Sequence, residues 1–401
     1  MENLLVYLDH NATTPVAPEV REAMAPFLST DWCNPSSPYR PAQRVRAAVD
    51  RAREEVAALL ACDPDEITFT SCATESCNLA ILGTARSAGP GARLVTVSTE
   101  HHAVLNAVKA AQAQGSDVMF LPVDRQGLLE SGAFIGSLLP RTVLVSVMLG
   151  NNETGVVQDI AAIGRACRER GILFHCDATA SIGKMAVRPQ DLSCDFLSLS
   201  GHKFGAPKGI GALYVRADVK AYPIMYGGEQ EAGLRPGTEN VAGIVGLGVA
   251  ARRAKQFAES GGPVRLDVLR NAIESGIRGR VPSAEFLSLP PDRPDRRLCN
   301  TLSVRVPGVR NDELVLLLDR EGICVSTGAA CATGASLPSH VIRAMGYADE
   351  EAREVIRISL GEENSERDVE RLVDAFARAA AALSGGSYLR TRVPVPVELP
   401  S

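Results

Sequence analysis

Short apolar segments alternate with amphipathic segments along most of the chain. Runs rich in apolar and β-branched residues, each of strand length, occupy residues 67–70, 93–98, 117–122, 142–148, 171–175, 195–199 and 209–215. Between several of them apolar residues recur at helical spacing, over 42–60, 101–114 and 160–170. Strands that alternate with helices in this way predict a mostly parallel sheet covered by helices on both faces, so we expect an α/β fold with seven strands.

The pattern changes after residue 260. An apolar helix predicted over 241–254 is followed by Gly261-Gly262, and strand-like runs then become fewer, at 301–306, 323–326 and 355–359. This change predicts a large domain over 15–260 and a smaller α+β domain made of 1–14 plus 261–385. We expect the proline-rich tail, 386–401, not to form a regular helix.

Composition narrows the class of protein. In 401 residues, 45% hydrophobic and 22% charged positions are typical of a packed soluble chain, and a net charge of −5 without a Lys and Arg run argues against nucleic-acid binding. The first residues lack a basic and apolar leader, and no run is long enough for a membrane span, so a cytoplasmic protein is expected. The ten cysteines contain no Cys-x-x-Cys pair, which favours free thiols and no metal site.

Polar residues follow several of the predicted strands. Asp177 lies just beyond the strand at 171–175, Ser200-Gly201-His202-Lys203 follows 195–199, and His101 and Asn152 follow two others. Carboxyl ends of parallel strands meet at one edge of a sheet, where ligands bind. An aspartate and a lysine there suit pyridoxal phosphate, because the lysine forms a Schiff base and the carboxylate keeps the pyridine nitrogen protonated. Taken alone, these two residues are better explained as a solvated loop lysine and a strand-end aspartate, so the rest of the chain must decide.

A possible phosphate site follows the strand at 67–70. Ser71-Cys72-Ala73-Thr74-Glu75 opens a helix that runs towards Arg86. The free backbone N–H groups and the dipole at a helix N-terminus attract anions, so a cofactor phosphate could bind there. The alternative is that Thr74 only caps the helix.

Several stretches together resemble one family. They include Tyr7-Leu8-Asp9-His10-Asn11-Ala12-Thr13-Thr14, Asn34-Pro35-Ser36-Ser37, Asn151-Asn152-Glu153-Thr154-Gly155, the 200–203 motif, Arg235 with Gly237-Thr238-Glu239-Asn240, and Ser326-Thr327-Gly328-Ala329-Ala330-Cys331. In this order they resemble the NifS-like and IscS-like cysteine desulfurases of aminotransferase class V, which are fold-type I pyridoxal-phosphate enzymes. The chain departs from the family pattern at Ala180, where a glutamine is usual, at Tyr39 for histidine, and at Cys72 for glycine.

The resemblance implies roles for individual residues. The catalytic residues would be Cys331, Lys203 and His101. The cofactor would be bound by Lys203, Asp177, His101, Ala73, Thr74, Asn152, Ser200 and His202, and by Thr238 from the other subunit of a homodimer. The substrate L-cysteine would be bound by Arg357, Asn152 and Asn11, since a guanidinium suits a carboxylate. Without the resemblance, the preferred interpretation of Arg357 is an exposed strand arginine.

Cys331 would carry the sulfur. It lies in the small-residue run 326–335, typical of a loop that moves. The implied reaction converts L-cysteine to L-alanine and passes sulfane sulfur through a Cys331 persulfide to an acceptor protein. One alternative is a selenocysteine or cysteine-sulfinate lyase, in which Cys331 would be dispensable. Another is a non-catalytic scaffold that binds a sulfur-accepting protein.

Overall fold

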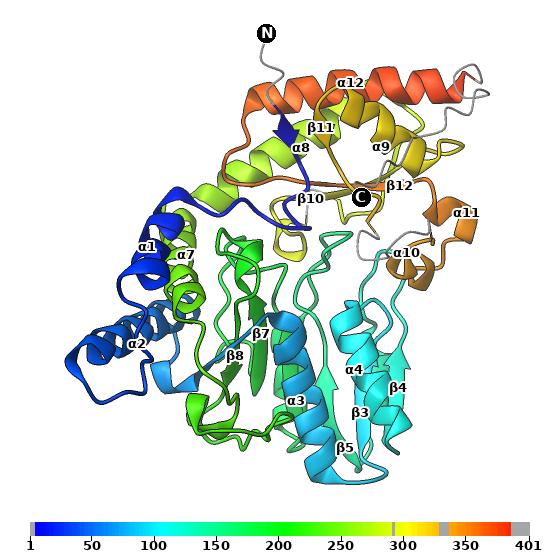
Figure 1. The fold of residues 1–401 in the computed structure, drawn as a ribbon. Coiled ribbons are helices and arrows are strands. Elements are labelled where there is room, and N and C mark those ends of the chain that lie inside the picture. The colour runs from blue at the N-terminus through cyan, green and yellow to red at the C-terminus, as the bar shows by residue number, and fades with distance from the viewer. Residues whose placement is uncertain (1–4, 291–292, 329–336, 386–401) are drawn as a thin grey trace, which may run out of the picture.

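A seven-stranded sheet forms the centre of the computed structural model, which describes residues 5–290, 293–328 and 337–385. The strands lie in the order β2 (Ile67–Thr70), β8 (Gly211–Val215), β7 (Phe196–Ser200), β6 (Leu173–Asp177), β5 (Thr142–Ser146), β3 (Arg93–Val97) and β4 (Asp117–Leu121). β8 runs antiparallel to both of its neighbours, and the other pairs are parallel. The predicted α/β fold with a mostly parallel sheet is confirmed (Figure 1).

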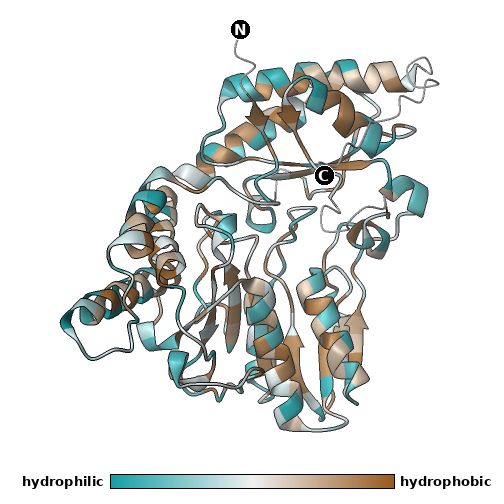
Figure 2. Ribbon diagram, viewed as in Figure 1, coloured by the Kyte–Doolittle hydropathy of each residue, from teal (hydrophilic) through white to brown (hydrophobic). Residues whose placement is uncertain are grey.

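Helices cover both faces of this sheet. Successive strand side chains point to opposite faces, so Leu94 packs with α3 (Ala73–Ala88) and α4 (His102–Ala113), while Val95 packs on the opposite face. That second face carries α1 (Pro18–Ser29), α2 (Arg40–Leu60), α5 (Ser131–Ser137), α6 (Ile160–Arg168) and α7 (Val241–Glu259). Figure 2 shows the strands as mainly hydrophobic, and the helices as a mixture of hydrophobic and hydrophilic turns.

A second hydrophobic core lies at one end of the sheet (Figure 1). It surrounds an antiparallel sheet of β12 (Val355–Ser359), β10 (Thr301–Arg305) and β9 (Glu285–Phe286), packed with α8 (Gly262–Arg280), α9 (Asn311–Arg320) and α12 (Glu366–Ser384). β1 (Val6–Tyr7) joins this core by pairing with β11 (Ile323–Cys324) in a parallel ladder. Beside it lie α10 (His340–Ala344) and α11 (Asp349–Ala352).

In the sequence, a sharp break between α7 and α8 separates the helix that packs in the first core from the helix that packs in the second. α7 continues five residues beyond the predicted end at 254. The chain changes direction at Gly261, whose φ of +82° is a left-handed conformation that glycine adopts without a steric penalty. A Cβ atom on Gly262 would lie 2.2 Å from the Phe257 ring, so a larger residue there would require this ring to move. The Gly261-Gly262 break in the sequence is therefore a tight connection between two long helices.

Two predicted features lie outside the described residues. Cys331 falls within residues 329–336, and the proline-rich tail is 386–401. Among the helices in the described ranges, none has the length and apolar character that a membrane span needs. In the same ranges, no group of three or more His, Cys, Asp or Glu side chains is arranged to hold a metal ion.

Candidate functional site

A cavity of about 270 Å³ opens at the carboxyl ends of the parallel strands. It lies where the sheet faces the second core, since strands β6 and β7 and strand β12 all contribute residues to its wall. Ten of the residues singled out in the sequence line it: Asn11, Ala73, Thr74, His101, Asn152, Asp177, Ser200, His202, Lys203 and Arg357. Residues from seven separate parts of the chain therefore surround one space.

Asp177 and Lys203 lie in the wall of this cavity. Asp177 is the last residue of β6 and is buried, and its Oδ1 accepts a hydrogen bond from the Thr179 backbone at 2.9 Å. Lys203 ends a single 3₁₀ turn, Gly201–Lys203, directly after β7. Its Nζ donates to the backbone oxygens of Asn11 at 2.5 Å and Ala12 at 3.0 Å. An amine and a carboxylate thus share one pocket, with backbone acceptors holding the amine.

An anion-binding surface is formed where β2 leads into α3. The first turn of α3 begins at Ala73, and its free N–H groups face the cavity side that Cys72, Ala73 and Thr74 line. β8 approaches this turn closely at Gly211. A Cβ atom there would lie 2.6 Å from the Leu199 oxygen and 2.9 Å from the Cys72 backbone. Only glycine allows the strand to support the helix N-terminus at this distance.

Two hydroxyl groups in the cavity wall have unused hydrogen-bonding capacity. The side-chain oxygens of Ser200 and Thr179 are buried and have no hydrogen-bond partner among the described residues. A buried hydroxyl without a partner is energetically unfavourable. Together with the α3 N-terminus, these donors fit a ligand that carries a phosphate. The residues present are therefore compatible with a phosphorylated cofactor.

His101 is held as a neutral imidazole at the start of α4. Its Nδ1 accepts a hydrogen bond from the Ala103 backbone at 3.1 Å, which leaves the proton of the neutral ring on Nε2. Burial lowers the pKa of His101, and the Lys203 and His340 charges lower it further, although Asp177 opposes them. The ring thus presents an uncharged face to the cavity.

The residue before His101 is also unusual. Glu100 is fully buried, and its Oε1 accepts a hydrogen bond from the Met148 backbone at 2.5 Å. Burial and the nearby Asp177 carboxylate raise the pKa of Glu100 well above its usual range. The buried position of Glu100 beside the cavity thus favours its uncharged form.

Arg357 faces the cavity from the second core. It lies in β12, and its side chain is almost completely buried, so it is not an exposed strand arginine. One Nη atom forms an ion pair with Asp9 at 2.6 Å, and the other donates to the Asn152 backbone oxygen at 3.2 Å. Its Nε is buried and has no partner within the described chain. A guanidinium with this remaining capacity can bind a carboxylate.

Asn11 and Asn152 join the two cores at the edge of the cavity. The Asn11 Nδ2 donates to the Asn152 backbone oxygen at 3.0 Å and to the Thr301 hydroxyl at 2.8 Å. The Asn11 Oδ1 accepts from Asn300 at 3.1 Å. The Asn11 amide is thus already used by protein groups, although the residue lines the cavity as predicted.

Two predicted site residues are not part of the cavity wall as described. Thr238 lines a separate hollow of about 190 Å³, together with Ser71 and Arg235. Arg235 forms an ion pair with Glu75 in the first turn of α3 at 2.9 Å, so this hollow lies beside the same helix N-terminus. Cys331 lies outside the described residues, but Gly328, three residues before it, lines the cavity.

Lys184 is a residue near the site that the sequence analysis missed. It is buried, and its Nζ donates to the Lys203 backbone oxygen at 3.4 Å. Burial lowers the pKa of Lys184 to about 8, and the Lys203 charge contributes in the same direction. The signal in the sequence was a lone lysine within the apolar run 178–187, with no acidic residue beside it.

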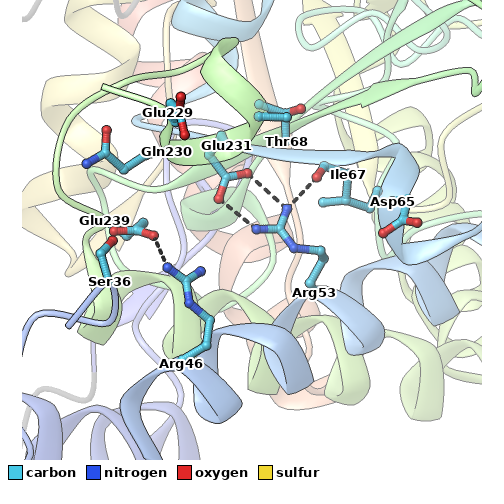
Figure 3. Close-up of a pocket in the computed structure, with 11 residues that line it drawn as sticks. Ser36, Arg46, Arg53, Asp65, Ile67, Thr68, Glu229, Gln230, Glu231 and Glu239 are labelled. Atoms are coloured by element: carbon cyan, nitrogen blue, oxygen red, sulfur yellow. Dashed lines mark hydrogen bonds and ion pairs between the residues drawn. The ribbon is translucent and has the colours of Figure 1, made fainter. Parts of the chain in front are cut away.

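A larger hollow, of about 560 Å³, contains none of the predicted site residues. Figure 3 shows its two ion pairs, in which Arg53 binds Glu231 through two hydrogen bonds of 2.7 and 2.9 Å and Arg46 binds Glu239 at 2.7 Å. Glu231 also accepts from the Phe69 backbone at 2.8 Å. The arginines are thus neutralised by glutamates that fix the loop 229–239 against α2 and β2. These contacts support the loop that carries Arg235 and Thr238.

Comparison with known proteins agrees with this geometry. The family model for aminotransferase class-V matches residues 6–372. The chain belongs to the class-V aminotransferase family. It is 41% identical to a cysteine desulfurase from Trichormus azollae over 93% of this chain and 92% of that protein. A solved NifS-like protein superposes with a TM-score of 0.86 at 35% identity, covering 95% of this chain and all of the other. SspA, solved in complex with cysteine, gives 0.77 at 36% identity, over 90% and 100% of the two chains.

The cysteines of this class-V chain are free thiols throughout the described residues. Most are buried, and burial raises the pKa of Cys77 and Cys176 well above the usual value. Cys77 lies beneath the cavity, with its sulfur 4.0 Å from the Asp177 Oδ2. Such thiols remain protonated and unreactive. Cys72 is the described cysteine that lines the cavity itself.

Proposed function

We propose that this protein is a pyridoxal-phosphate-dependent cysteine desulfurase. It converts L-cysteine to L-alanine and transfers the sulfur, through a persulfide on Cys331, to an acceptor protein. One observation carries the proposal: Lys203, Asp177, His101 and Arg357 line one cavity, and Gly328 brings the chain that leads to Cys331 to the same wall. The class-V relatives named cysteine desulfurase support it.

The residues of the cavity would hold the cofactor at both ends. Lys203 would bind it covalently, Asp177 would pair with the ring nitrogen, and His101 would stack on the ring. Its phosphate would be bound by the α3 N-terminus at Ala73 and Thr74, and by Ser200 and His202, with Asn152 at the ring. When bound, pyridoxal phosphate supplies an electron sink next to the amino-acid Cα. Asp177, an acceptor fixed by the Thr179 backbone, suits the role of holding a proton on the ring nitrogen.

Substrate binding would use Arg357 and its neighbours. The guanidinium would bind the L-cysteine carboxylate, which fixes the amino acid with its Cα towards Lys203. The Lys203 amine can then accept the Cα proton and return a proton to the product. His101, uncharged because burial lowers its pKa, can pass protons through Nε2 without adding positive charge to the cavity.

Sulfur transfer would use the Cys331 thiolate as the nucleophile. It attacks the substrate sulfur, so an S–S bond forms while the substrate Cβ–S bond breaks. The bonding pair remains with the carbon, which takes up a proton and becomes the methyl group of alanine. The products are L-alanine and Cys331 persulfide, and no oxidant is consumed. An acceptor thiol then attacks the terminal sulfur and restores Cys331.

The proposal extends to assembly and location. Two hydrophobic cores and the break between α7 and α8 support a large domain of 15–260 and a small domain of 1–14 plus 261–385. Thr238 lines a hollow beside the α3 N-terminus and does not line the cavity of its own subunit. This position supports a contribution of Thr238 to the cofactor site of a second subunit. The proposed enzyme is thus a homodimer, acting in the cytoplasm.

Purified protein reconstituted with pyridoxal phosphate tests the proposal directly. In the presence of a thiol reductant such as dithiothreitol, which reduces the persulfide, wild type should show the visible absorbance of a lysine-bound cofactor and release alanine and sulfide from L-cysteine. Lys203→Ala should lose the covalent absorbance, whereas Cys331→Ala should retain it and lose sulfide release. Full turnover of L-cysteine by Cys331→Ala would instead indicate a lyase. Absence of the absorbance in wild type would favour a non-catalytic scaffold.

A further inference from the structure

Both flanks of the segment that carries Cys331 meet one buried carboxylate. On the C-terminal side, the Ser339 hydroxyl donates to the Glu153 Oε2 at 2.5 Å. On the N-terminal side, a Cβ atom built on Gly328 would lie 2.9 Å from the same oxygen. The Gly328 main chain therefore lies beside the Glu153 carboxylate, and its φ of +83° is a conformation that disfavours any residue with a side chain.

Glu153 is well placed to act as a fixed point. It follows Asn152 in the buried turn after β5, and its backbone N–H donates to the Asn151 side chain at 2.9 Å. The Asn151 amide in turn donates to the Thr99 backbone oxygen at 3.0 Å. Both Glu153 and Ser339 are buried, so their hydrogen bond is shielded from water. The carboxylate is thus part of the rigid end of the large sheet.

Each flank has a second attachment beside the cavity. Ser326 exchanges two backbone hydrogen bonds with Arg357, of 2.7 and 3.0 Å, and its hydroxyl accepts from the Gly328 N–H at 3.2 Å. His340 donates from Nε2 to the Glu100 backbone oxygen at 2.9 Å, and its ring lies 4.5 Å from that of His102. The flanks are therefore tied to the strand of Arg357 and to the residues on either side of His101.

Covalent geometry links this anchor to the thiol. Cys331 follows Gly328 by three residues, so the two Cα atoms are at most about 11 Å apart. Because Gly328 lines the cavity, its position determines which points the Cys331 sulfur can reach. If Gly328 is displaced, the region that the Cys331 sulfur can reach is displaced with it relative to the substrate.

We propose that Glu153 is a positioning residue for sulfur transfer, which holds Gly328 and Ser339 together against the large sheet and so sets the reach of Cys331. This rests on the proposed function for the role of Cys331, while the anchor itself rests on the contacts above. Glu153 itself acts only through the segment it holds, and does not touch the substrate.

The test separates the anchor from ordinary helix capping. Ser339 also caps α10, since its hydroxyl accepts from the Val341 and Ile342 N–H groups. Ser339→Asp keeps a good cap but cannot donate to Glu153, and Ser339→Thr keeps both interactions. Glu153→Ala removes the carboxylate. Ser365→Ala is the matched control, because Ser365 caps the distant helix α12.

We expect kcat for L-cysteine to fall about tenfold or more in Glu153→Ala and in Ser339→Asp, with an unchanged KM and unchanged visible cofactor absorbance. The double variant should be no slower than the slower single variant, because both changes break the same contact. Ser339→Thr and Ser365→Ala should remain within twofold of wild type. An unchanged kcat, additive losses in the double variant, or a loss of absorbance equal to the loss of kcat would overturn the proposal.

A second measurement tests the anchor without turnover. The alkylation rate of Cys331 by iodoacetamide, followed by peptide mass spectrometry, should rise about threefold in Glu153→Ala and Ser339→Asp, because the Ser339 flank loses its attachment to Glu153. The rate at Cys33, a partly exposed thiol elsewhere on the chain, should not change. Equal rates at Cys331 in all variants would contradict the anchor. Wild type that releases no alanine would contradict the proposed function instead, and the alkylation rates would still decide the anchor.

Discussion

Arg357 and Asp9, which are 348 positions apart in the sequence, form an ion pair of 2.6 Å in the wall of the candidate site. Asp9 follows β1, so the pair joins the start of the chain to strand β12. A substrate carboxylate that binds Arg357 must therefore share this guanidinium with Asp9. Two predictions follow from the two partners.

Arg357→Lys should raise the KM for L-cysteine about tenfold or more. Lysine keeps the charge but cannot reproduce the planar fork that binds a carboxylate through two hydrogen bonds. Steady-state kinetics at fixed pH provide the measurement, and the visible cofactor absorbance should stay at the wild-type level. A KM within twofold of wild type would show that Arg357 does not bind the substrate.

Asp9→Asn should lower the KM for L-cysteine about threefold, because the carboxylate that competes for Arg357 is removed. The same substitution should lower the free energy of unfolding by about 3 kcal/mol, because the Arg357 charge loses its buried partner. Urea unfolding measures the second effect. Asp312→Asn is the matched control: its ion pair with Arg310 is exposed, so the expected change is below about 0.5 kcal/mol. A higher KM in Asp9→Asn would mean that Asp9 orients Arg357 rather than competing for it.

Gly211→Ala should destabilise the fold by about 3 kcal/mol and weaken cofactor binding. The new methyl group would meet backbone atoms of Leu199 and Cys72, which cannot move without displacing the start of α3. Unfolding in urea and cofactor titration measure the two effects. Gly279→Ala in α8, where no atom lies within 4 Å, should instead stabilise the chain by about 0.5–1 kcal/mol.

Acid should destabilise the fold between pH 6.5 and about 4, in part through His175. This imidazole is fully buried between the Ser146 and Ser198 hydroxyls, each 2.8 Å away, and burial lowers its pKa from 6.5 to about 4. The unfolded chain thus binds a proton at a higher pH than the folded chain, so stability falls as the pH decreases through this range. His175 alone should account for about 2 kcal/mol between pH 7 and pH 5.

His175→Gln provides the check, with urea unfolding at both pH values. The variant should lose about 2 kcal/mol less than wild type on acidification. It retains a smaller dependence, because burial also lowers the pKa of His10 and His202 to about 4. An identical pH dependence in wild type and variant would show that His175 is not the titrating group.

Ala180→Gln should lower the pH midpoint of the bound cofactor's visible absorbance by about one unit. Ala180 lines the cavity, and a glutamine there would add an amide N–H donor next to the cofactor oxygen. A donor favours the charged form of that oxygen and so promotes loss of the shared proton. Absorbance titration provides the measurement, and an unchanged midpoint would show that the amide does not reach the cofactor.

The sheet was predictable because several of its strands contain short uninterrupted apolar runs, as at residues 143–145 in β5. The predicted strand at 142–148 extends two residues beyond β5. Val147 and Met148 follow the strand and are buried, and the Val147 N–H still donates to the His175 backbone oxygen at 3.1 Å. The helix Ser131–Ser137 was missed, because Gly132 and Gly136 weaken its helical pattern.

The part of the site that lies at strand ends could be predicted from the sequence. Asp177 and Lys203 line one cavity because they lie at the carboxyl ends of two adjacent parallel strands. The pairing of Arg357 with Asp9 and the burial of Lys184 depend on how the second core packs on the sheet, and no local pattern encodes that packing. The anchor at Glu153 was hidden for the same reason, since its two contacts come from residues far along the chain.

The pairing of β1 with β11 has a consequence for the order in which the protein can fold during synthesis. Val6 and Leu8 belong to the second core, yet the partner strand at Ile323 emerges from the ribosome only after most of the chain has been made. The central sheet, complete by Val215, can form while the first residues still wait for their partners. A nascent chain must therefore keep a hydrophobic N-terminal strand unpaired for most of translation, and its docking closes the cavity wall at Asn11 as one of the last steps.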